Sequence, residues 1–284
     1  MPVQVDPQAL PSLGALHISG PDALAYLQGQ LSADLPRLQP GQLGWAGLHS
    51  PQGRVLALLA IAPLAQGGDW LAVLPAMLAE SAAGALRRFV LRARVRIDVA
   101  PPGAVCLPGV ELPAGAQALG HPGGEPLWWL PGGGAAPADA GAQSAWRRAG
   151  VQRGLPQVYP ETSGTFVAQM LNLDCIGAIA FDKGCYTGQE VVARAHYRGR
   201  VKRRMQRFAS ANLPAAPGGG ELPPGSTLRL ADGRNAQLVR SARQADGSME
   251  WLAVCAWPAH DEAPGDAVPA VDSRALPLPY ALPE

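Results

Sequence analysis

The sequence predicts an α+β fold in which antiparallel sheets carry helices and a small β-barrel forms the C-terminal part. Near the N-terminus, two apolar strands joined by a short loop precede a helix and a third strand. This order is typical of an antiparallel sheet with helices on one face. After residue 199 the chain holds four further strand-like segments separated by loops, as in a small barrel. The chain has 284 residues, 48% of them hydrophobic, which is enough for two or three domains.

The first elements are a strand over 15–19 and a helix over about 22–30. Ser19 or Asp22 can cap this helix, and Pro21 lies near its start. Apolar side chains recur along it at helical spacing, at Ala23, Leu24, Leu27 and Leu31.

A second region begins near residue 45. The apolar run 54–62 predicts a strand, and 71–74 predicts its hairpin partner. A helix is expected over 75–89, with a proline near its start. A strand is expected over 90–99, because three arginines alternate there with apolar residues and give one solvated basic face.

The rest of the chain predicts one more helix and the barrel. The helical stretch 143–150 contains Trp146 and leads into a motif region. Barrel strands are expected over 201–208, 227–230, 236–241 and 249–257. The tail after residue 263 is rich in proline and is expected to wrap the surface or to fray.

Composition narrows the classes of function. The formal net charge of +1 predicts no obligate nucleic-acid or membrane partner. No stretch approaches 18 apolar residues, and the N-terminus has no basic start before an apolar run, so neither a membrane span nor a targeting segment is expected. No Cys-x-x-Cys and no close Cys/His pair occur, so this chain alone is not expected to hold a metal or a cluster. The spacing of the cysteines suggests no disulfide framework, which favours a reducing, cytoplasmic compartment: Cys106, Cys175, Cys185 and Cys255.

The octapeptide 183–190 carries the clearest chemical signal. Two glycines flank Cys185 and permit tight or left-handed backbone, so the thiol is expected on a turn. Lys183 lies two residues away, and a nearby cation favours the thiolate, which is the reactive form. Thr187 can cap a helix that begins near Gln189, and a cysteine just before a helix gains further thiolate stabilisation. A buried cysteine in an ordinary turn explains these residues equally well.

This octapeptide resembles the signature of the YgfZ family, whose pattern is Lys-Gly-Cys-aromatic-x-Gly-Gln-Glu. Further pieces follow in the family's order. Residues 26–34 resemble its N-terminal helix and turn, and Gly53 its glycine turn into a strand. Trp146 with 154–156 resembles its Trp…Gly-Ile-Pro segment, and 169–173 resembles the stretch before the signature. The resemblance is strong over about residues 14–60 and 146–207.

The resemblance implies a fold, a cofactor and partners. YgfZ-type proteins share the three-domain cloverleaf of the glycine-cleavage T protein, whose central hole holds tetrahydrofolate. The expected domains are 1–45 with 141–197, an inserted ferredoxin-like domain over 46–140, and a C-terminal β-barrel over 198–284. The family supports the assembly or repair of iron–sulfur enzymes, one of which thiolates transfer RNA. Folate, iron–sulfur client enzymes and assembly proteins are therefore the expected partners.

The family's functional cysteine and its companion lysine correspond to Cys185 and Lys183, the expected reactive thiol and its activator. The rest of the signature corresponds to Gly184, Tyr186, Thr187, Gly188, Gln189, Glu190 and Arg194. Contacts to tetrahydrofolate, or to a one-carbon derivative of it, are expected from polar residues near the signature: Gln169, Asn172, Arg198 and Arg200. For Gln169 and Asn172, a plain surface position is an equal explanation.

One departure separates this chain from the true aminomethyltransferase. That enzyme resembles the chain around Gly53 but carries an Asp-Asp pair a few residues later. Ala57 and Leu58 stand at the aligned positions, and neither can take up a proton. The expected function is therefore a tetrahydrofolate-binding accessory protein for iron–sulfur enzymes that affects transfer-RNA modification. A folate-dependent one-carbon transferase is the alternative.

A basic segment supports a third hypothesis. Residues 194–207 contain no acid, and His196 and Tyr197 interleave with the cations. Arginine pairs bidentately with carboxylate or phosphate, so polyglutamylated folate or transfer RNA are suitable anions. A solvated strand edge is the other explanation. The hypothesis is a module that binds transfer RNA or a protein through the Arg198–Arg207 patch. The cations of the segment are Arg194, Arg198, Arg200, Lys202, Arg203, Arg204 and Arg207.

Overall fold

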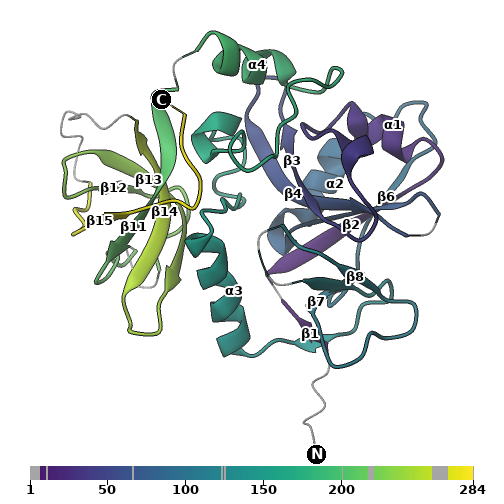
Figure 1. Cartoon of the computed structure of the whole chain (residues 1–284), viewed down its shortest axis with the longest axis horizontal. Helices are drawn as coiled ribbons and strands as arrows, with labels where there is room; N and C mark the ends of the chain where they lie inside the picture. Colours follow the sequence, from purple (N-terminus) through teal and green to yellow (C-terminus); the bar gives the residue numbers. More distant parts are fainter. Residues whose placement is uncertain are drawn as a thin grey trace, which may run out of the picture.

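The computed structural model describes residues 7–10, 12–65, 67–122, 124, 126–199, 201–216, 221–257 and 268–283. Within them the chain forms three five-stranded sheets with helices between and beside them (Figure 1). This is the predicted α+β class. No helix in these ranges is both long and apolar enough to cross a membrane.

The central sheet is antiparallel, with the strand order β3-β4-β5-β2-β6. Successive side chains alternate between its faces: Leu59 and Ile61 join one buried cluster, and Ala60 joins another. Both faces are therefore covered. The strands are β2 (Leu13–Ser19), β3 (Gly44–His49), β4 (Val55–Pro63), β5 (Trp70–Pro75) and β6 (Arg96–Val99).

Helices beside this sheet begin near the predicted places. They are α1 (Ala23–Gln28), the 3-10 turns η1 (Leu35–Arg37) and η2 (Ala76–Leu78), and α2 (Ala79–Arg87). The strand predicted over 90–99 is wrong in its first half, because only 96–99 pair with β2. The Asp22 carboxylate accepts from both the backbone and the side chain of Arg94 and ties that stretch to the start of α1.

The second sheet was missed by the sequence analysis. Its strands are two or three residues long, in the order β10-β1-β7-β9-β8. Leu119, Leu127 and Trp129 from this sheet pack against Ala60 and Val73 of the central sheet. The strands are β1 (Gln8–Ala9), β7 (Val105–Leu107), β8 (Gln117–Leu119), β9 (Leu127–Trp129) and β10 (Ala136–Pro137).

The third sheet stands where the barrel was predicted, with the order β12-β13-β14-β11-β15. The backbone of 269–271 pairs with Arg229 of β12, and β15 pairs with β11 at the other edge. The C-terminal segment therefore links the two edges of the sheet, as in a barrel. The strands are β11 (Arg203–Ser210), β12 (Thr227–Arg229), β13 (Asn235–Arg243), β14 (Met249–Ala256) and β15 (Arg274–Leu276).

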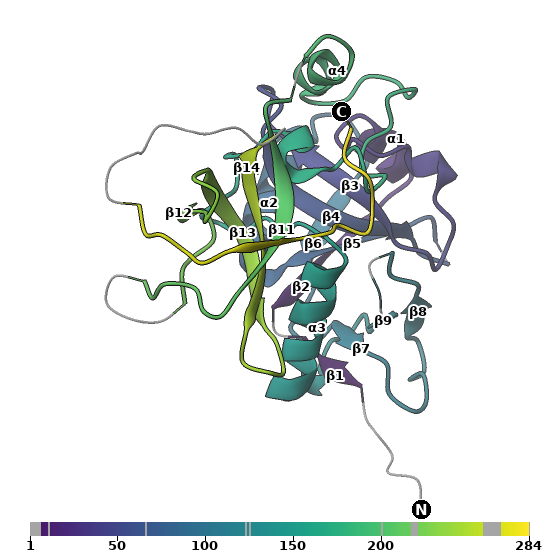
Figure 2. The ribbon, with the colours of Figure 1, turned by 60° about the vertical axis from the view of Figure 1, so that its left-hand side comes forward.

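Three further helical elements follow in the described part of the chain. The helix α3 (Ala140–Gln152) packs against β13 and β14 (Figure 2). The 3-10 turn η3 (Ala168–Leu171) contacts β11 and α4 (Gln189–Tyr197).

The strand β2 shares the central sheet with β3 to β6, and the expected domain boundary at 45/46 falls inside β3. The sheets thus group residues 13–99 together.

Candidate functional site

A cavity lies where α3, the central sheet and the third sheet meet. The space inside it that is open to a water-sized molecule is about 60 Å³. Ligand sites for small molecules usually measure about 300–1,000 Å³, so its walls would have to move apart to admit such a ligand. Trp45, His121 and Trp146 form an aromatic wall, with the His121 ring centroid 5.2 Å from Trp45 and 5.1 Å from Trp146. Burial lowers the pKa of His121 to about 4, helped by the charge of Arg153, so its imidazole is neutral at pH 7.

The charge in this cavity is positive. Arg240 of β13 and Arg153 line it, and no Asp or Glu is among the described residues that do so. The side chain of Arg240 is buried, with Nη1 donating to the Leu155 carbonyl at 3.3 Å and Nη2 to that of Arg147 at 3.4 Å. Its Nε has no hydrogen-bond partner among the described residues. Burial lowers the pKa of this guanidinium from its ordinary value. A buried cation with a free donor is costly unless an anion pairs with it.

A glycine in α3 makes room for this arginine. A Cβ at Gly150 would lie 2.4 Å from Arg240 Nη1. Glycine in a helix interior costs about 1 kcal/mol relative to alanine, so its place here needs a packing reason. The guanidinium supplies that reason. A shift in register between Leu238 and Arg240 marks an irregularity in β13 just before the arginine, and the sequence alone gives no sign of it.

The signature lies apart from this cavity, in a turn before α4. Lys183 Nζ donates to the backbone carbonyls of Gln28, Leu31 and Ala33, at 2.7, 2.7 and 2.8 Å. A neutral amine has only two hydrogens, so three acceptors require the ammonium form. Burial acts in the opposite direction and lowers the pKa of Lys183 to about 8. Lys183 therefore fastens the signature to the N-terminal segment 28–33.

Two glycines fix the start of α4. Gly188 caps the helix at φ +82°, and Gly53 turns into β4 at φ +70°. A Cβ on Gly188 would lie 3.1 Å from the Gly53 Cα, and one on Gly53 would lie 2.7 Å from Val191 Cβ. Both positions thus require glycine for conformation and for space. Thr187 is not the cap, because its hydroxyl donates to Gln30 Oε1 at 3.3 Å.

The thiol of Cys185 is exposed on this turn, while Tyr186 beside it is buried. Burial raises the pKa of Tyr186 to about 12, and Lys183 Nζ lies 5.3 Å from the centre of its ring. His49 lies against the Tyr186 ring at 6.1 Å and is 1% exposed. Burial lowers the pKa of His49 to about 4. The sequence analysis gave His49 no role, and an isolated histidine offers no signal.

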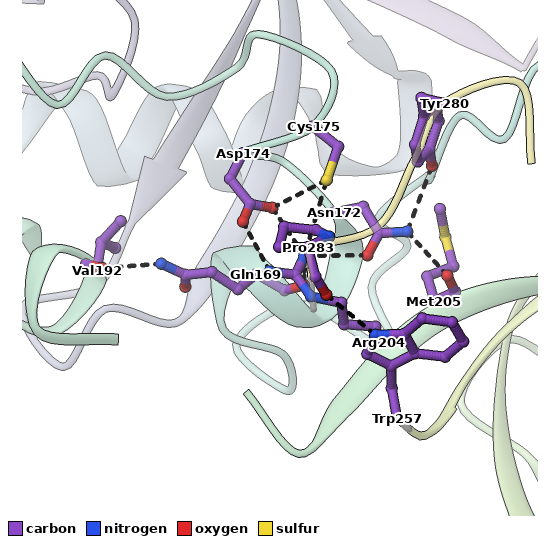
Figure 3. A network of polar contacts seen from close by, with 10 residues as sticks. All are labelled: Gln169, Asn172, Asp174, Cys175, Val192, Arg204, Met205, Trp257, Tyr280 and Pro283. Atoms are coloured by element: carbon purple, nitrogen blue, oxygen red, sulfur yellow. Dashed lines mark hydrogen bonds and ion pairs between the residues drawn. The ribbon is translucent and has the colours of Figure 1, made fainter. Parts of the chain in front are cut away.

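Gln169 and Asn172, two of the predicted folate contacts, lie in a buried network (Figure 3). Gln169 Nε2 donates to the Val192 carbonyl of α4, and Asn172 Nδ2 donates to the Met205 carbonyl of β11, both at 2.8 Å. Neither residue lines the cavity beside α3. Asn172 is the non-glycine residue with positive φ in the described ranges, at 56°. The two side chains join the signature helix to the third sheet.

A buried ion pair anchors this network. Arg204 Nη1 and Nη2 bind the two carboxylate oxygens of Asp174 at 3.0 and 2.8 Å, and the side chains are 4% and 7% exposed. Arg204 Nη1 also donates to the Gln169 carbonyl. The tail joins from the other side, where Tyr280 contacts Asn172 Nδ2 and donates to the Gly154 carbonyl. Sequence reasoning did not single out Asp174.

The basic segment therefore does not form one exposed patch. Arg204 pairs with Asp174, Arg207 pairs with Glu250, and Arg203 donates to the Asn235 carbonyl. Exposed cations remain at Arg194, Arg198 and Lys202. The predicted contact Arg200 lies outside the described residues. Of the other signature positions, Gly184 and Glu190 are exposed, and Gln189 is partly buried.

Comparisons with known proteins agree with this fold. No family model matches the chain. A tRNA-modifying protein YgfZ from Edwardsiella ictaluri is 32% identical over 94% of this chain and 89% of its own length. A protein of the same name from Colwellia psychrerythraea is 29% identical over 69% of each chain. The aminomethyltransferase T of the glycine cleavage system from Bartonella henselae superposes with a TM-score of 0.60 over 89% of this chain and 78% of that one.

At 13% identity, the Bartonella structure establishes the fold alone, which is the predicted T-protein architecture. The Edwardsiella relative shows more than the fold, because the two sequences align over nearly the whole of both chains. The chain belongs to the YgfZ family.

Proposed function

We propose that the protein binds tetrahydrofolate, or a one-carbon derivative of it, in the cavity beside α3 and serves transfer-RNA modification. The observation that carries the proposal is the charge of this cavity. It holds the buried, incompletely paired guanidinium of Arg240 and has no acid among its described lining residues. The name of the Edwardsiella and Colwellia relatives, tRNA-modifying protein YgfZ, supports the second part.

The lining residues fit the chemistry of a folate. Its pterin is a flat ring that suits a wall of Trp45, His121 and Trp146. Its glutamate carboxylates suit Arg240 and Arg153, because arginine binds carboxylate through charge-assisted hydrogen bonds. When bound, the cofactor would supply a carrier for one-carbon groups.

The signature turn would serve a partner and not the cofactor. Cys185 is exposed and is not among the residues that line the cavity. We assign it the role of a reactive thiol that meets an iron–sulfur client enzyme or an assembly protein. Lys183 would have a positioning role, because its ammonium group already has three carbonyl acceptors. It would hold the turn that presents the thiol.

Aminomethyl transfer is not favoured. The wall of the cavity contributed by β4 consists of Leu58 and Ala60, and both are apolar. Ala57, the other residue aligned with the aspartate pair of the enzyme, is buried. General acid–base work on an aminomethyl group needs an ionisable side chain near the reacting atoms. The described walls hold no carboxylate that could pair with a cationic aminomethyl group, and their ionisable side chains are His121, Arg153 and Arg240.

The test is a calorimetric titration of the purified protein with tetrahydrofolate under anaerobic, reducing conditions. We expect saturable binding at one site. Arg240→Gln should weaken it about tenfold or more, since a hydrogen bond to a charged group is worth about 1.5–3 kcal/mol. Arg243→Gln on the same strand is the matched control, because Arg243 is exposed. Absence of binding to protein shown to be folded, or equal affinity of Arg240→Gln and wild type, would refute the cavity as the site.

A further inference from the structure

Three aromatic rings form a cluster beside the signature. The Phe181 ring stacks on the His196 ring, with centroids 3.7 Å apart and planes inclined by 17°. Tyr197 meets His196 edge-on at 4.7 Å and Phe181 at 6.0 Å. Phe181 lies four residues before Cys185, and the other two rings end α4. The cluster thus includes a residue of the segment that leads into the thiol turn.

The cluster is open to solvent. Tyr197 is 67% exposed and His196 is also exposed. In both overall views α4 lies at the periphery of the molecule (Figure 1, Figure 2). Tyr197 and Phe181 also line a surface groove with about 440 Å³ of space open to water-sized molecules. Large aromatic side chains on a surface commonly mark a binding site, and their faces are available for stacking.

The charged side chains near these rings fall into two groups. Arg194 and Arg198, at the end of α4, are exposed and form no ion pair among the described residues. The groove itself holds Arg37, which bridges Asp34 at 2.7 Å and Asp182 at 2.7 Å. That trio leaves one net negative charge, so the groove suits a neutral, hydrogen-bonding group. An anion would lie on the helix side instead.

This division matches an unpaired nucleotide, which has a flat neutral base and an anionic phosphate. Proteins that bind single strands combine aromatic stacking platforms with cations that follow the backbone. We infer that Phe181, His196 and Tyr197 stack an unpaired base of a single-stranded RNA segment, while Arg194 and Arg198 hold its phosphates. The choice of RNA rests on the proposed role in transfer-RNA modification. The contact would bring the RNA beside Cys185.

Fluorescence anisotropy with a labelled, unstructured RNA decamer tests this inference. Tyr197→Ala should weaken binding about fivefold or more, because stacking is worth about 1–3 kcal/mol per base. Tyr197→Phe should keep the affinity, since the ring face remains. Arg198→Gln should reduce the slope of log affinity against log salt by about one unit, whereas Arg92→Gln, an exposed arginine on another loop, should leave it unchanged.

Three results would overturn the inference: no saturable binding of the decamer, equal affinity of Tyr197→Ala and wild type, or equal affinity for an RNA duplex. A protein partner for the same surface would then be the better explanation. The tetrahydrofolate titration, repeated on Tyr197→Ala, separates the two proposals. Unchanged folate affinity with weakened RNA binding supports both sites. Normal folate binding without RNA binding refutes the RNA site alone.

Discussion

Replacing Lys183 with methionine tests how the signature is held in place. The substitution keeps an unbranched side chain of similar length and removes the ammonium group. Three carbonyls would lose their donor, those of Gln28, Leu31 and Ala33. The segment that carries them also holds Ser32, whose hydroxyl donates to the Ala178 carbonyl at 2.6 Å. Loss of the clamp should therefore loosen residues 28–33 as well as the thiol turn.

The magnitude follows from the three bonds. A hydrogen bond to a charged group is worth about 1.5–3 kcal/mol, and a buried acceptor left unsatisfied costs about 1–3 kcal/mol. Lys183 is only half-buried, so water can replace part of the lost hydrogen bonding. Removing the charge also removes the cost of taking it out of water. We expect about 1 kcal/mol per carbonyl, so that the free energy of unfolding falls by about 3 kcal/mol.

Urea unfolding followed by circular dichroism measures this loss as a lower midpoint at constant slope. Lys202→Met is the matched control, because Lys202 is exposed and is the other lysine of the chain. It should change the unfolding free energy by less than about 0.5 kcal/mol. Amide hydrogen exchange over 28–33 should quicken in Lys183→Met only. If both variants unfold at the midpoint of the wild type, the clamp contributes nothing and our interpretation of Lys183 is wrong.

Three further predictions concern the buried charges and the thiol. Asp174→Asn leaves Arg204 without its anion and should lower the unfolding free energy by about 3–5 kcal/mol in the same urea assay; a loss below about 1 kcal/mol would contradict a desolvated pair. His49 and His121 stay neutral when folded, with pKa values of about 4 against 6.5 unfolded, so the unfolded chain binds more protons below pH 6.5. Stability should fall by about 2 kcal/mol for each histidine from pH 7 to pH 5, and His49→Leu should remove half of that loss. An unchanged slope in that variant would refute the assignment. Cys185→Ala should abolish complementation in cells that depend on the protein while its unfolding midpoint stays constant, and full complementation would remove the thiol from the mechanism.

The sequence predicted the elements whose signals are local. The strands β4 and β5 are long apolar runs between turn residues, and α1 follows from its helical spacing. The second sheet escaped prediction because its strands have two or three residues, too few to show alternation. The strand expected over 90–99 failed because Arg94 is bound by Asp22, 72 residues away in the chain.

The candidate site likewise contains residues that the sequence predicted and residues that depend on distant parts of the chain. The signature turn was predictable from the motif, since its residues lie within one octapeptide, but the motif left the exposure of Cys185 open. The partners of Lys183 were not, because its acceptors lie 150 or more positions earlier. Arg240 looks like an ordinary strand arginine, and its burial depends on a strand irregularity and on Gly150 of another element. Gln169 and Asn172 were singled out for their polarity, and the structure gives them partners in the network of Arg204.

Hydrogen–deuterium exchange of the protein with and without saturating tetrahydrofolate tests the central claim most directly, because it locates the ligand. The account predicts slower exchange in the segment 146–158 and in β13 around Arg240, with α4 unchanged. Protection confined to 167–175 and to α4, where Gln169, Asn172 and Arg198 lie, would contradict the cavity beside α3 as the folate site.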